Sequence, residues 1–490
     1  MQMAYLKQLL KNCNFLCLQG ELEKKVTEIC YDSGKARKGS MFVCLKGQYR
    51  DGHDYISEAV CHGATVCVVQ HNVVIDAEVT VIRVRDTREA LAILSAEFYG
   101  NPARHLRVIG ITGTKGKTST ACMIYQMLRY AGCQAGMIGT MGIFFGEENT
   151  TYPNTTPESL VIQQMMRRMV DAGCGFCVME VSSQGLKNHR VDGIVFDIGV
   201  FTNISPDHIG AGEHASFAEY LSCKSRIFAR SRRCLINADD CRVKKAARKS
   251  GRAFVTYGIQ NCADYRAGQI TYETYADCLG MRYTLSGACD GIVELGIPGI
   301  YNVYNSLAAI AVCRELNIPA EYQRLALRRI KIRGRMEEIR VSEDYRLLID
   351  YAHNAVSFEN LLETLRAYHP KRLVTLFGCG GNRSKLRRYQ MGEVAGRLSD
   401  VTILTSDNPR YEDPEDIILD IETGLRKTTG SYIKITDRRE AIAYALTNAK
   451  KGDLIVLAGK GHEQYQEIKG HFYPMDERKM IDEVICQYHY

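Results

Sequence analysis

The chain has 490 residues, 46% of them hydrophobic and 24% charged, a balance typical of folded globular proteins that excludes wholesale disorder. Lys and Arg number 63 against 56 Asp and Glu, a formal net charge of +7 that is too small and too dispersed to indicate a dedicated nucleic-acid binder. No stretch approaches the ~20 apolar residues of a membrane span, and the N-terminal segment lacks the apolar core of a signal peptide.

Nineteen cysteines are scattered along the chain, and only Cys174 and Cys177 have C-x-x-C spacing. No second pair follows at the spacing of a zinc site, so we favour ordinary packing for both. Many unpatterned cysteines indicate buried thiols in a reducing compartment. We therefore expect a cytoplasmic protein with no nucleic-acid partner, and a monomer.

The length predicts about three domains at roughly 150 residues each. Residues 1–103 carry short apolar runs at 41–45 and 64–69, typical of a small mixed α/β domain. Residues 104–333 begin as strand, glycine loop and helix, which predicts an ATPase domain of the P-loop type with a mostly parallel sheet. The elements expected there are strands at 107–112, 176–181 and 194–202, a helix ending at 130, hairpins between 268 and 296, and a helix over 302–316.

Residues 334–490 alternate strand and helix, which predicts a parallel, Rossmann-like α/β domain. The expected strands are 347–351, 373–377, 401–405 and 454–458. Three of them run into polar or glycine-rich segments at 378–383, 407–410 and 459–463. Because ligands of such sheets bind beyond the carboxyl ends of the strands, we expect these loops to form a binding site.

The strongest local motif is Gly110-Ile-Thr-Gly-Thr-Lys-Gly-Lys-Thr118, which follows a strand and opens a helix. Glycines let backbone N–H groups approach a polyphosphate, and the helix N-terminus adds partial positive charge. Lys117 is placed to neutralise the β- and γ-phosphates and Thr118 to hold magnesium. A glycine-rich turn with a surface lysine is the alternative, which the strand–loop–helix context disfavours. The motif predicts an ATP site.

Three other polar positions lie in the same region. Glu180 ends an apolar strand and is the expected acidic ligand of the magnesium ion. His208 follows another apolar strand, and Lys224 lies on the next predicted helix. Taken alone, these two read as a turn histidine and a solvated lysine.

Arg383, Arg410 and Glu463 stand at the ends of neighbouring predicted strands of the C-terminal domain. Two guanidinium groups and a carboxylate can bind a zwitterion that carries carboxylates and an ammonium group. Surface ion pairs are the alternative, and they explain any one of these residues better than all three together.

The motifs, in this order, resemble the Mur ligase family over essentially the whole chain. The matching segments are EVSS (180–183), FTNISPDH (201–208), YLSCKSRIF (220–228), GIYNVYNSLAAIA (299–311), GRME (334–337), DYAHN (350–354) and GKGHE (459–463). Within the family, Asp407-Asn-Pro-Arg410 is most similar to the form that adds meso-diaminopimelate. The resemblance implies an ATP-dependent, ADP-forming ligase that extends UDP-MurNAc-L-Ala-D-Glu through an acyl phosphate, with Mg²⁺ as its cofactor.

The resemblance also implies roles for residues. Lys117, Glu180, His208, Lys224 and His353 would be catalytic, with Lys224 carbamoylated and joined by Thr118, Glu180 and His208 in holding metal. The implied ATP-binding residues are Gly113, Thr114, Lys115, Gly116, Lys117, Thr118, Ser119, Asn302, Arg335 and Asp350. The implied UDP-MurNAc-dipeptide residues are Ser33, Thr155, Thr156, Ser182 and Arg190. The implied diaminopimelate residues are Arg383, Asp407, Asn408, Pro409, Arg410, Gly459 and Glu463.

Several positions depart from the family pattern, namely Gly34, Gln184, the 209–214 segment, Ala355 and Asn382. None of them removes a group that the implied chemistry needs. Because Arg410 would lie buried and unpaired against lysine, we expect a strong preference for diaminopimelate. The alternatives are a sibling ligase that adds lysine or another amino acid, a folylpolyglutamate-type ligase, and a non-catalytic protein on the same fold.

Overall fold

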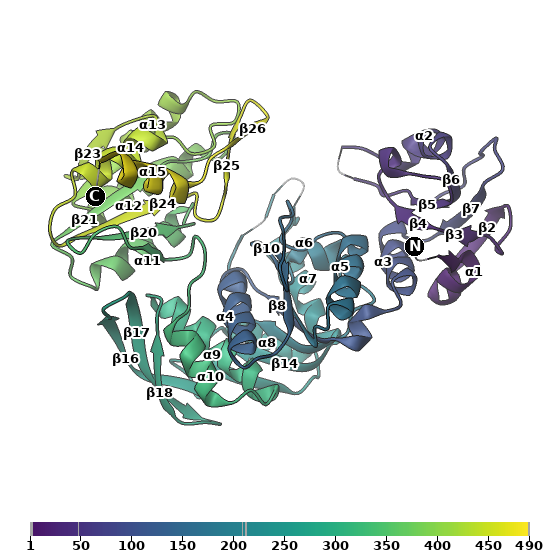
Figure 1. Cartoon of the computed structure of the whole chain (residues 1–490), viewed down its shortest axis with the longest axis horizontal. Helices are drawn as coiled ribbons and strands as arrows, with labels where there is room; N and C mark the ends of the chain where they lie inside the picture. Colours follow the sequence, from purple (N-terminus) through teal and green to yellow (C-terminus); the bar gives the residue numbers. More distant parts are fainter. Residues whose placement is uncertain (1–2, 48, 208, 211–212, 489–490) are drawn as a thin grey trace. The chain divides into compact units, whose positions relative to one another are not determined.

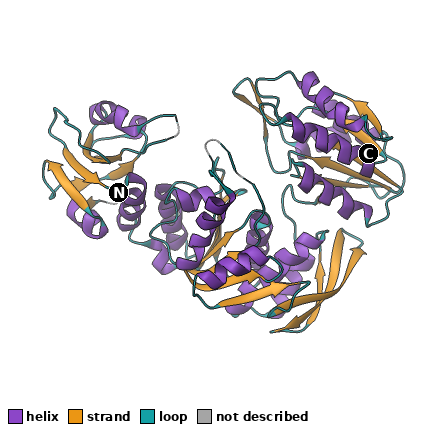
Figure 2. Cartoon of the chain, turned by 180° about the vertical axis from the view of Figure 1, so that it is seen from behind, coloured by secondary structure: helices purple, strands orange, loops and turns teal. Residues whose placement is uncertain are grey.

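The computed structural model describes residues 3–47, 49–207, 209–210 and 213–488. It confirms the predicted α/β class, with helices packed on mostly parallel sheets (Figure 1 and Figure 2). The chain forms two compact units, Met1–Arg266 with Tyr304–Leu325, and Ala267–Val303 with Ala326–Tyr490. This division does not separate the first two expected domains, so the boundaries near 103 and 333 remain a prediction. Within the described ranges, no helix is long and apolar enough to cross a bilayer.

The N-terminal residues of the first unit form a sheet of order β2-β7-β6-β5-β4, in which only the β2–β7 pair is antiparallel. Alternate residues of β6 point to opposite faces, with Val66 and Val68 in one apolar cluster and Cys67 and Val69 in another. The elements are β1 (Ala4–Tyr5), α1 (Leu6–Leu9), β2 (Phe15–Gln19), β3 (Lys25–Val26), β4 (Glu28–Cys30), β5 (Ser40–Val43), α2 (Ile56–Cys61), β6 (Ala64–Val69), β7 (Thr80–Val84) and α3 (Thr87–Phe98).

The larger sheet has the order β11-β10-β9-β12-β8-β13-β14-β15 within the first unit, with β12 and β13 parallel to β8 on either side. The carboxyl ends of these three strands therefore lie side by side. The strands are β8 (Arg107–Thr112), β9 (Ala135–Gly139), β10 (Gly142–Phe145), β11 (Glu148–Thr150), β12 (Phe176–Glu180), β13 (Phe196–Phe201), β14 (Ser231–Asn237) and β15 (Phe254–Gly258). The helices are α4 (Lys117–Tyr130), α5 (Ser159–Asp171), α6 (Ser183–Lys187), α7 (Phe217–Ala229) and α8 (Cys241–Lys249).

Helix α5 shows how the sequence builds this core. Its buried residues Ile162, Met165, Met166 and Met169 recur at the three- and four-residue spacing of one helix face. That face belongs to the same apolar cluster as Met179 of β12. The strand that ends in Glu180 is therefore held by packing over its length.

Strand β16 (Tyr265–Thr274) and helix α9 (Ile300–Glu315) each run from one unit into the other. In the second unit, β17 (Leu279–Gly287) and β18 (Gly291–Leu295) form an antiparallel hairpin within the range 268–296, where hairpins are expected. Helix α10 (Ala320–Arg328) follows α9.

The C-terminal sheet has the order β19-β20-β24-β21-β22-β23, and every pair except β19–β20 is parallel. One face packs on α11, α12 and α13 and the other on α14 and α15 (Figure 1). The strands of this sheet are β19 (Glu337–Ile339), β20 (Arg346–Asp350), β21 (Arg372–Phe377), β22 (Val401–Leu404), β23 (Ser431–Lys434) and β24 (Asp453–Ala458). A separate antiparallel pair is formed by β25 (Tyr465–Ile468) and β26 (His471–Pro474). The helices are α11 (Ala355–Arg366), α12 (Lys385–Leu398), α13 (Pro414–Leu425), α14 (Arg438–Thr447) and α15 (Glu477–Tyr488).

Because β24, β21 and β22 are neighbours, the three polar loops that follow them lie at one edge of this sheet, as the sequence predicts. The end of β20 lies beside the end of β24 at the same edge. The fold therefore places four polar segments of the second unit together.

Two glycines allow α12 and α13 to pack at close range. A Cβ atom at Gly424 would lie 1.9 Å from the carbonyl oxygen of Tyr389, and one at Gly392 would lie 2.1 Å from that of Ile421. We expect Gly424→Ala to lower the free energy of unfolding by about 1–3 kcal/mol, because overpacking outweighs the ~1 kcal/mol that alanine ordinarily adds in a helix. Urea unfolding of the purified variant measures this change.

Gly175→Ala is the control, since a Cβ atom there would have no neighbour within 4 Å. Its free energy of unfolding should stay within about 0.5 kcal/mol of the starting protein. A Gly424→Ala variant as stable as the starting protein would contradict the close packing of α12 on α13.

Candidate active site

The loop at 113–117 joins β8 to α4 and needs glycine at two positions. A Cβ atom at Gly113, where φ is +150°, would lie 1.9 Å from the Thr202 hydroxyl oxygen. One at Gly116, where φ is +83°, would lie 2.3 Å from Oδ1 of Asn305. Polar side chains thus lie directly against the loop backbone and leave no room for a Cβ atom at either position. Thr202 and Asn305 belong to the matching segments 201–208 and 299–311, but neither was assigned a role from the sequence.

The residues after β13 fix the middle of this loop. The backbone N–H of Lys115 donates to Oδ1 of Asn203 at 3.0 Å, and Nδ2 of Asn203 donates to the Lys115 carbonyl at 3.0 Å. The Thr202 hydroxyl donates to the same carbonyl at 2.7 Å. The Lys115 ammonium lies 3.4 Å from Asp207. Thr202 and Asn203 follow an apolar strand and lie in the matching 201–208 segment, but we predicted no role for either.

Two lysine side chains meet at one carbonyl of the loop. Lys117 Nζ donates to the carbonyl oxygens of Gly113 at 2.9 Å and Thr114 at 3.1 Å, and Lys224 Nζ donates to that of Gly113 at 2.8 Å. Lys224 is 1% exposed, and its Nζ lies 4.8 Å from the centre of the Tyr220 ring. The reading of Lys224 as a solvated helix residue is therefore wrong.

Burial lowers the pKa of the Lys224 ammonium well below its ordinary value, and the neighbouring ammonium of Lys117 lowers this pKa further. A buried amine with a depressed pKa is readily held in its neutral form. Only the neutral amine can act as a nucleophile towards carbon dioxide.

Glu180 is the centre of the polar contacts beside the loop. It is fully buried, and Oε2 accepts hydrogen bonds from the hydroxyls of Thr118 at 2.9 Å and Thr140 at 3.1 Å. Oε1 accepts from the Thr140 backbone N–H at 2.8 Å, and the Glu180 carbonyl accepts from the Thr156 hydroxyl at 2.9 Å. A Cβ atom at Gly139 would lie 2.3 Å from Oε1, so this glycine makes room for the carboxylate.

The donor set around Glu180 fits a hard divalent cation. Among the described residues, the hydrogen-bond donors of this buried carboxylate are hydroxyls and a backbone N–H, and no ion pair with it occurs. A buried charge without a counter-ion is costly, and carboxylate and hydroxyl oxygens are ligands that Mg²⁺ prefers. His208, the other expected metal ligand, lies outside the described residues.

A second group of potential ligands lies at the start of α7. The ligand atoms of His214, Glu219 and Cys223 all lie within 4.8 Å of one another. The Lys187 ammonium lies 2.8 Å from Oε1 of Glu219, so this carboxylate already forms an ion pair within the protein. We assign no metal to this group.

Four residues expected at a muramoyl-dipeptide site gather next to Glu180. The Thr155 hydroxyl lies 3.0 Å from that of Thr140, and the Thr156 hydroxyl accepts from the Ser182 backbone N–H at 2.9 Å. Arg190 donates to the Thr156 carbonyl at 3.0 Å, and its Nη2 lies 2.7 Å from Glu158, a partner that we did not predict.

Ser33 lies on a short 3₁₀ turn, where its hydroxyl donates to Glu58 at 2.7 Å. Ser119, the last of the residues expected to bind ATP through this loop, is buried on α4.

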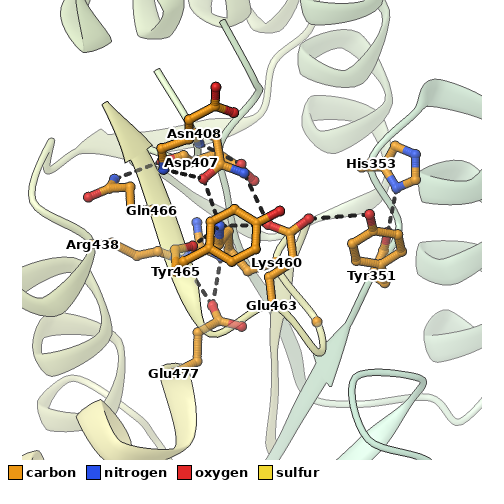
Figure 3. A network of polar contacts seen from close by, with 12 residues as sticks. Tyr351, His353, Asp407, Asn408, Arg438, Lys460, Glu463, Tyr465, Gln466 and Glu477 are labelled. Carbon is orange, nitrogen blue, oxygen red and sulfur yellow. Dashed lines mark hydrogen bonds and ion pairs between the residues drawn. The ribbon is translucent and has the colours of Figure 1, made fainter. Parts of the chain in front are cut away.

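In the second unit, Lys460 is the centre of the network at the ends of β22 and β24 (Figure 3). Its side chain is fully buried, and Nζ donates to Oδ1 of Asn408 at 2.9 Å, Oε2 of Glu463 at 2.7 Å and the Tyr465 carbonyl at 2.6 Å. Oε2 of Glu463 also accepts from Nδ2 of Asn408 at 3.0 Å. Lys460 was missed, although its position between two glycines of the GKGHE segment was a signal.

The remaining residues of the 407–410 and 459–463 segments pack tightly. The Asp407 carbonyl accepts from Nε2 of Gln466 at 2.7 Å, and a Cβ atom at Gly459 would lie 2.9 Å from Oδ2 of Asp407. A Cβ atom at Gly381 would lie 1.8 Å from the carbonyl oxygen of Pro409. These contacts hold the three loops close together.

A buried ion pair lies behind these loops. Arg438 and Glu477 are each 1% exposed at the side chain, with Nη2 and Oε1 2.7 Å apart. Arg438 also donates to the carbonyl oxygens of Ser406 and Ala458, both at 3.0 Å. It thereby links the residue before the 407–410 segment to the residue before Gly459.

Arg410 is not unpaired, which corrects one expectation from the sequence. Its Nε donates to Oε2 of Glu467 at 2.8 Å, and Nη1 donates to the Gly381 carbonyl at 2.8 Å. A ligand without a carboxylate would therefore not leave this guanidinium without a counter-ion. Arg383, the other expected cation, is exposed.

The residues expected to contact nucleotide from the C-terminal domain surround Tyr351. Backbone N–H groups of Met336 and Ala352 donate to the Asp350 carboxylate, each at 2.8 Å. Burial raises the pKa of Asp350, and the Arg335 guanidinium opposes this rise. The guanidinium of Arg335 lies 4.5 Å from the Tyr351 ring.

Tyr351 connects this group to the Lys460 network. Its hydroxyl donates to Oε1 of Glu463 at 3.3 Å, and its carbonyl lies 2.8 Å from Nδ1 of the exposed His353 (Figure 3). Asn302 lies on α9, where its side chain donates to the Pro298 carbonyl at 2.8 Å.

Three family models match the chain. They are described as the Mur ligase middle domain, the Mur ligase glutamate ligase domain, and the catalytic domain of the Mur ligase family, and they match residues 111–313, 334–461 and 25–99. A relative from Clostridium perfringens (strain 13 / Type A), named UDP-N-acetylmuramoyl-L-alanyl-D-glutamate--2,6-diaminopimelate ligase, is 40% identical over 489 residues. The alignment covers 98% of this chain and 99% of the relative.

Solved structures agree with these matches. The structure of a protein with that same name is 27% identical, with a TM-score of 0.71 over 100% of both chains. A folylpolyglutamate synthase from Mycobacterium tuberculosis, solved with ADP and AMPPCP, is 18% identical, with a TM-score of 0.61 over 76% of this chain and 92% of that one. The second likeness is one of fold alone.

The contact between Gly116 and Asn305 makes a testable prediction. We expect Gly116→Ala to weaken nucleotide binding by about tenfold or more, because the added methyl group must displace Asn305 and the loop with it. Calorimetric titration with ATP measures this change in affinity.

The control Gly132→Ala separates the two effects of the substitution, which are backbone strain at a left-handed φ and the clash of the added Cβ atom with a neighbour. Gly132 has a similar left-handed φ of +76°, yet a Cβ atom there would have no neighbour within 4 Å. This variant should bear the same backbone strain and bind ATP within about twofold of the starting protein. Equal losses in both variants would show that the loop contact is unimportant.

Proposed function

The chain belongs to the Mur ligase family, and on that premise we propose that it is an ATP-dependent amide-bond ligase of peptidoglycan precursor synthesis. It joins meso-diaminopimelate to the D-glutamate of UDP-MurNAc-L-Ala-D-Glu and releases ADP and phosphate. This is the reaction that its relatives' names describe.

One observation carries the proposal: a continuous chain of polar contacts leads from the phosphate loop to the expected dipeptide residues. It runs from Thr118 through Glu180 and Thr140 to Thr155, with steps of 2.9, 3.1 and 3.0 Å. Phosphoryl transfer depends mainly on positioning and charge stabilisation, so a donor loop and an acceptor site held by one buried carboxylate suit it.

The reaction has two steps. A carboxylate oxygen of D-glutamate attacks the γ-phosphorus of ATP, and the bond from that phosphorus to the ADP oxygen breaks. The amine of the incoming amino acid then attacks the acyl phosphate, loses a proton and expels inorganic phosphate. Lys117 offers positive charge to the transferring phosphoryl group. Mg²⁺, which Thr118, Glu180 and His208 would hold, supplies further neutralisation of phosphate charge when bound.

Lys224 fits a role as a carbamate. Its buried neutral amine would add to carbon dioxide, forming an N–C bond and releasing a proton. The product is an acidic oxygen ligand, and it places a negative charge beside the ammonium of Lys117 in place of a neutral amine.

The other assignments complete the proposal. Residues 1–103 bind the uridine diphosphate end through Ser33, residues 104–333 bind ATP and the muramoyl dipeptide, and residues 334–490 bind the amino acid. Arg335, Asp350 and His353 contact nucleotide from the last of these. The protein acts as a monomer on small molecules in the cytoplasm. A reducing compartment suits its nineteen cysteines, which all lie in the described ranges and form no disulfide there.

Phosphate release tests the reaction directly. We expect release only when ATP, UDP-MurNAc-L-Ala-D-Glu and meso-diaminopimelate are all present, with the amide product identified by mass. Lysine in place of diaminopimelate should give a lower kcat/KM. No phosphate release with either amino acid would favour a non-catalytic protein, and equal kcat/KM for lysine would favour the sibling ligase.

The carbamate makes a second prediction. Lys224→Ala should lower kcat by about 10³-fold or more, because an oxygen ligand beside the phosphoryl group is lost, and added short carboxylates should restore part of the activity. Lys245→Ala, on the exposed side of α8, should leave kcat unchanged. Full activity of Lys224→Ala would remove the carbamate from the mechanism.

A further inference from the structure

Glu467 is the counter-ion of Arg410 within the amino-acid site. The two side chains are joined at 2.8 Å, and each is about four-fifths buried, with 22% of Arg410 and 21% of Glu467 exposed. Among the described residues this is the only ion pair that Glu467 makes. The pair is therefore a feature of the site and not of a wider surface network.

The backbone holds the two residues in register. Arg410, at a left-handed φ of +54°, donates its N–H to the Glu467 carbonyl at 3.0 Å and accepts at its own carbonyl from the Lys469 N–H at 2.7 Å. With Nη1 on the Gly381 carbonyl, Arg410 is fixed from two directions. The guanidinium cannot easily swing away from Glu467.

The pairing limits how Arg410 can bind a second carboxylate. Nε is taken by Glu467 and Nη1 by Gly381. The remaining N–H groups lie on Nη1 and Nη2, so a ligand carboxylate must share the guanidinium with the carboxylate of Glu467 or displace it. Two carboxylates on one guanidinium repel each other, so Glu467 weakens the contact that distinguishes a ligand with a distal carboxylate.

We propose that Glu467 is a specificity-determining residue that stands in for the distal carboxylate of the amino-acid substrate. This inference rests on the proposed function. With diaminopimelate bound, Glu467 opposes the ligand carboxylate. With lysine bound, Glu467 keeps Arg410 neutralised and so removes the penalty of a buried, unpaired cation. Both effects lower the preference for diaminopimelate over lysine.

Glu467→Gln tests the inference with little change in shape, because the amide keeps the backbone contacts and an oxygen that can accept from Nε. We expect the ratio of kcat/KM for diaminopimelate to that for lysine to rise by about tenfold or more. The rise should come from a lower KM for diaminopimelate and an unchanged or higher KM for lysine, with the KM for ATP unchanged. Glu467→Ala, which removes the charge differently, should raise the ratio as well.

Glu483→Gln is the matched control, since Glu483 pairs with Arg439 at 3.1 Å on α15 and α14, outside the site. This variant should leave the ratio unchanged, and thermal unfolding of all variants checks that they are folded. An unchanged or lower ratio in Glu467→Gln, or a KM for ATP that moves with it, would overturn the inference. If the starting protein releases no phosphate with either diaminopimelate or lysine, the proposed function fails first and the inference falls with it.

Discussion

Burial of charge at the carboxyl ends of parallel strands is the constraint on which the candidate sites of both units depend. Such strands bring polar loops together. Each charged group that is buried there needs an oppositely charged or hydrogen-bonding partner, because an unpaired buried charge lowers the stability of the fold. The C-terminal sheet meets the constraint internally: Lys460 is paired with Glu463, and Arg438 with Glu477. The central sheet leaves the charge of Glu180 and the amine of Lys224 to be satisfied by other means.

This contrast separates the two kinds of ligand. Loops that contain ion pairs place positive and negative groups close together. This arrangement suits a zwitterionic amino acid, whose charged groups can replace the partners within those pairs. The Glu180 carboxylate, which has no ion-pair partner among the described residues, lies next to a glycine loop and suits a polyphosphate that arrives with a divalent cation. Arg410 affects both the binding and the selectivity of the amino-acid ligand, because Glu467 already neutralises the guanidinium that a ligand carboxylate would contact.

The sequence predicted the elements well and the pairings poorly. The strand at 107–112 and the helix ending at Tyr130 agree with β8 and α4, because apolar periodicity and glycine punctuation are local signals. Glu180 was found because it ends a strand. Lys460 and Glu467 were missed, since their partners are set by tertiary contacts between loops far apart in sequence. For the same reason Arg410 was expected to lack a counter-ion with lysine bound, so the physical argument for the preference changes while the expected preference for diaminopimelate stands.

The central claim is that the carboxylate of the acceptor substrate becomes an acyl phosphate. UDP-MurNAc-L-Ala-D-Glu labelled with ¹⁸O in the side-chain carboxylate tests it, because attack of that oxygen on the γ-phosphorus transfers it to the phosphate that the amine later expels. The account predicts one labelled oxygen in each phosphate released during amide formation. Unlabelled phosphate would contradict it.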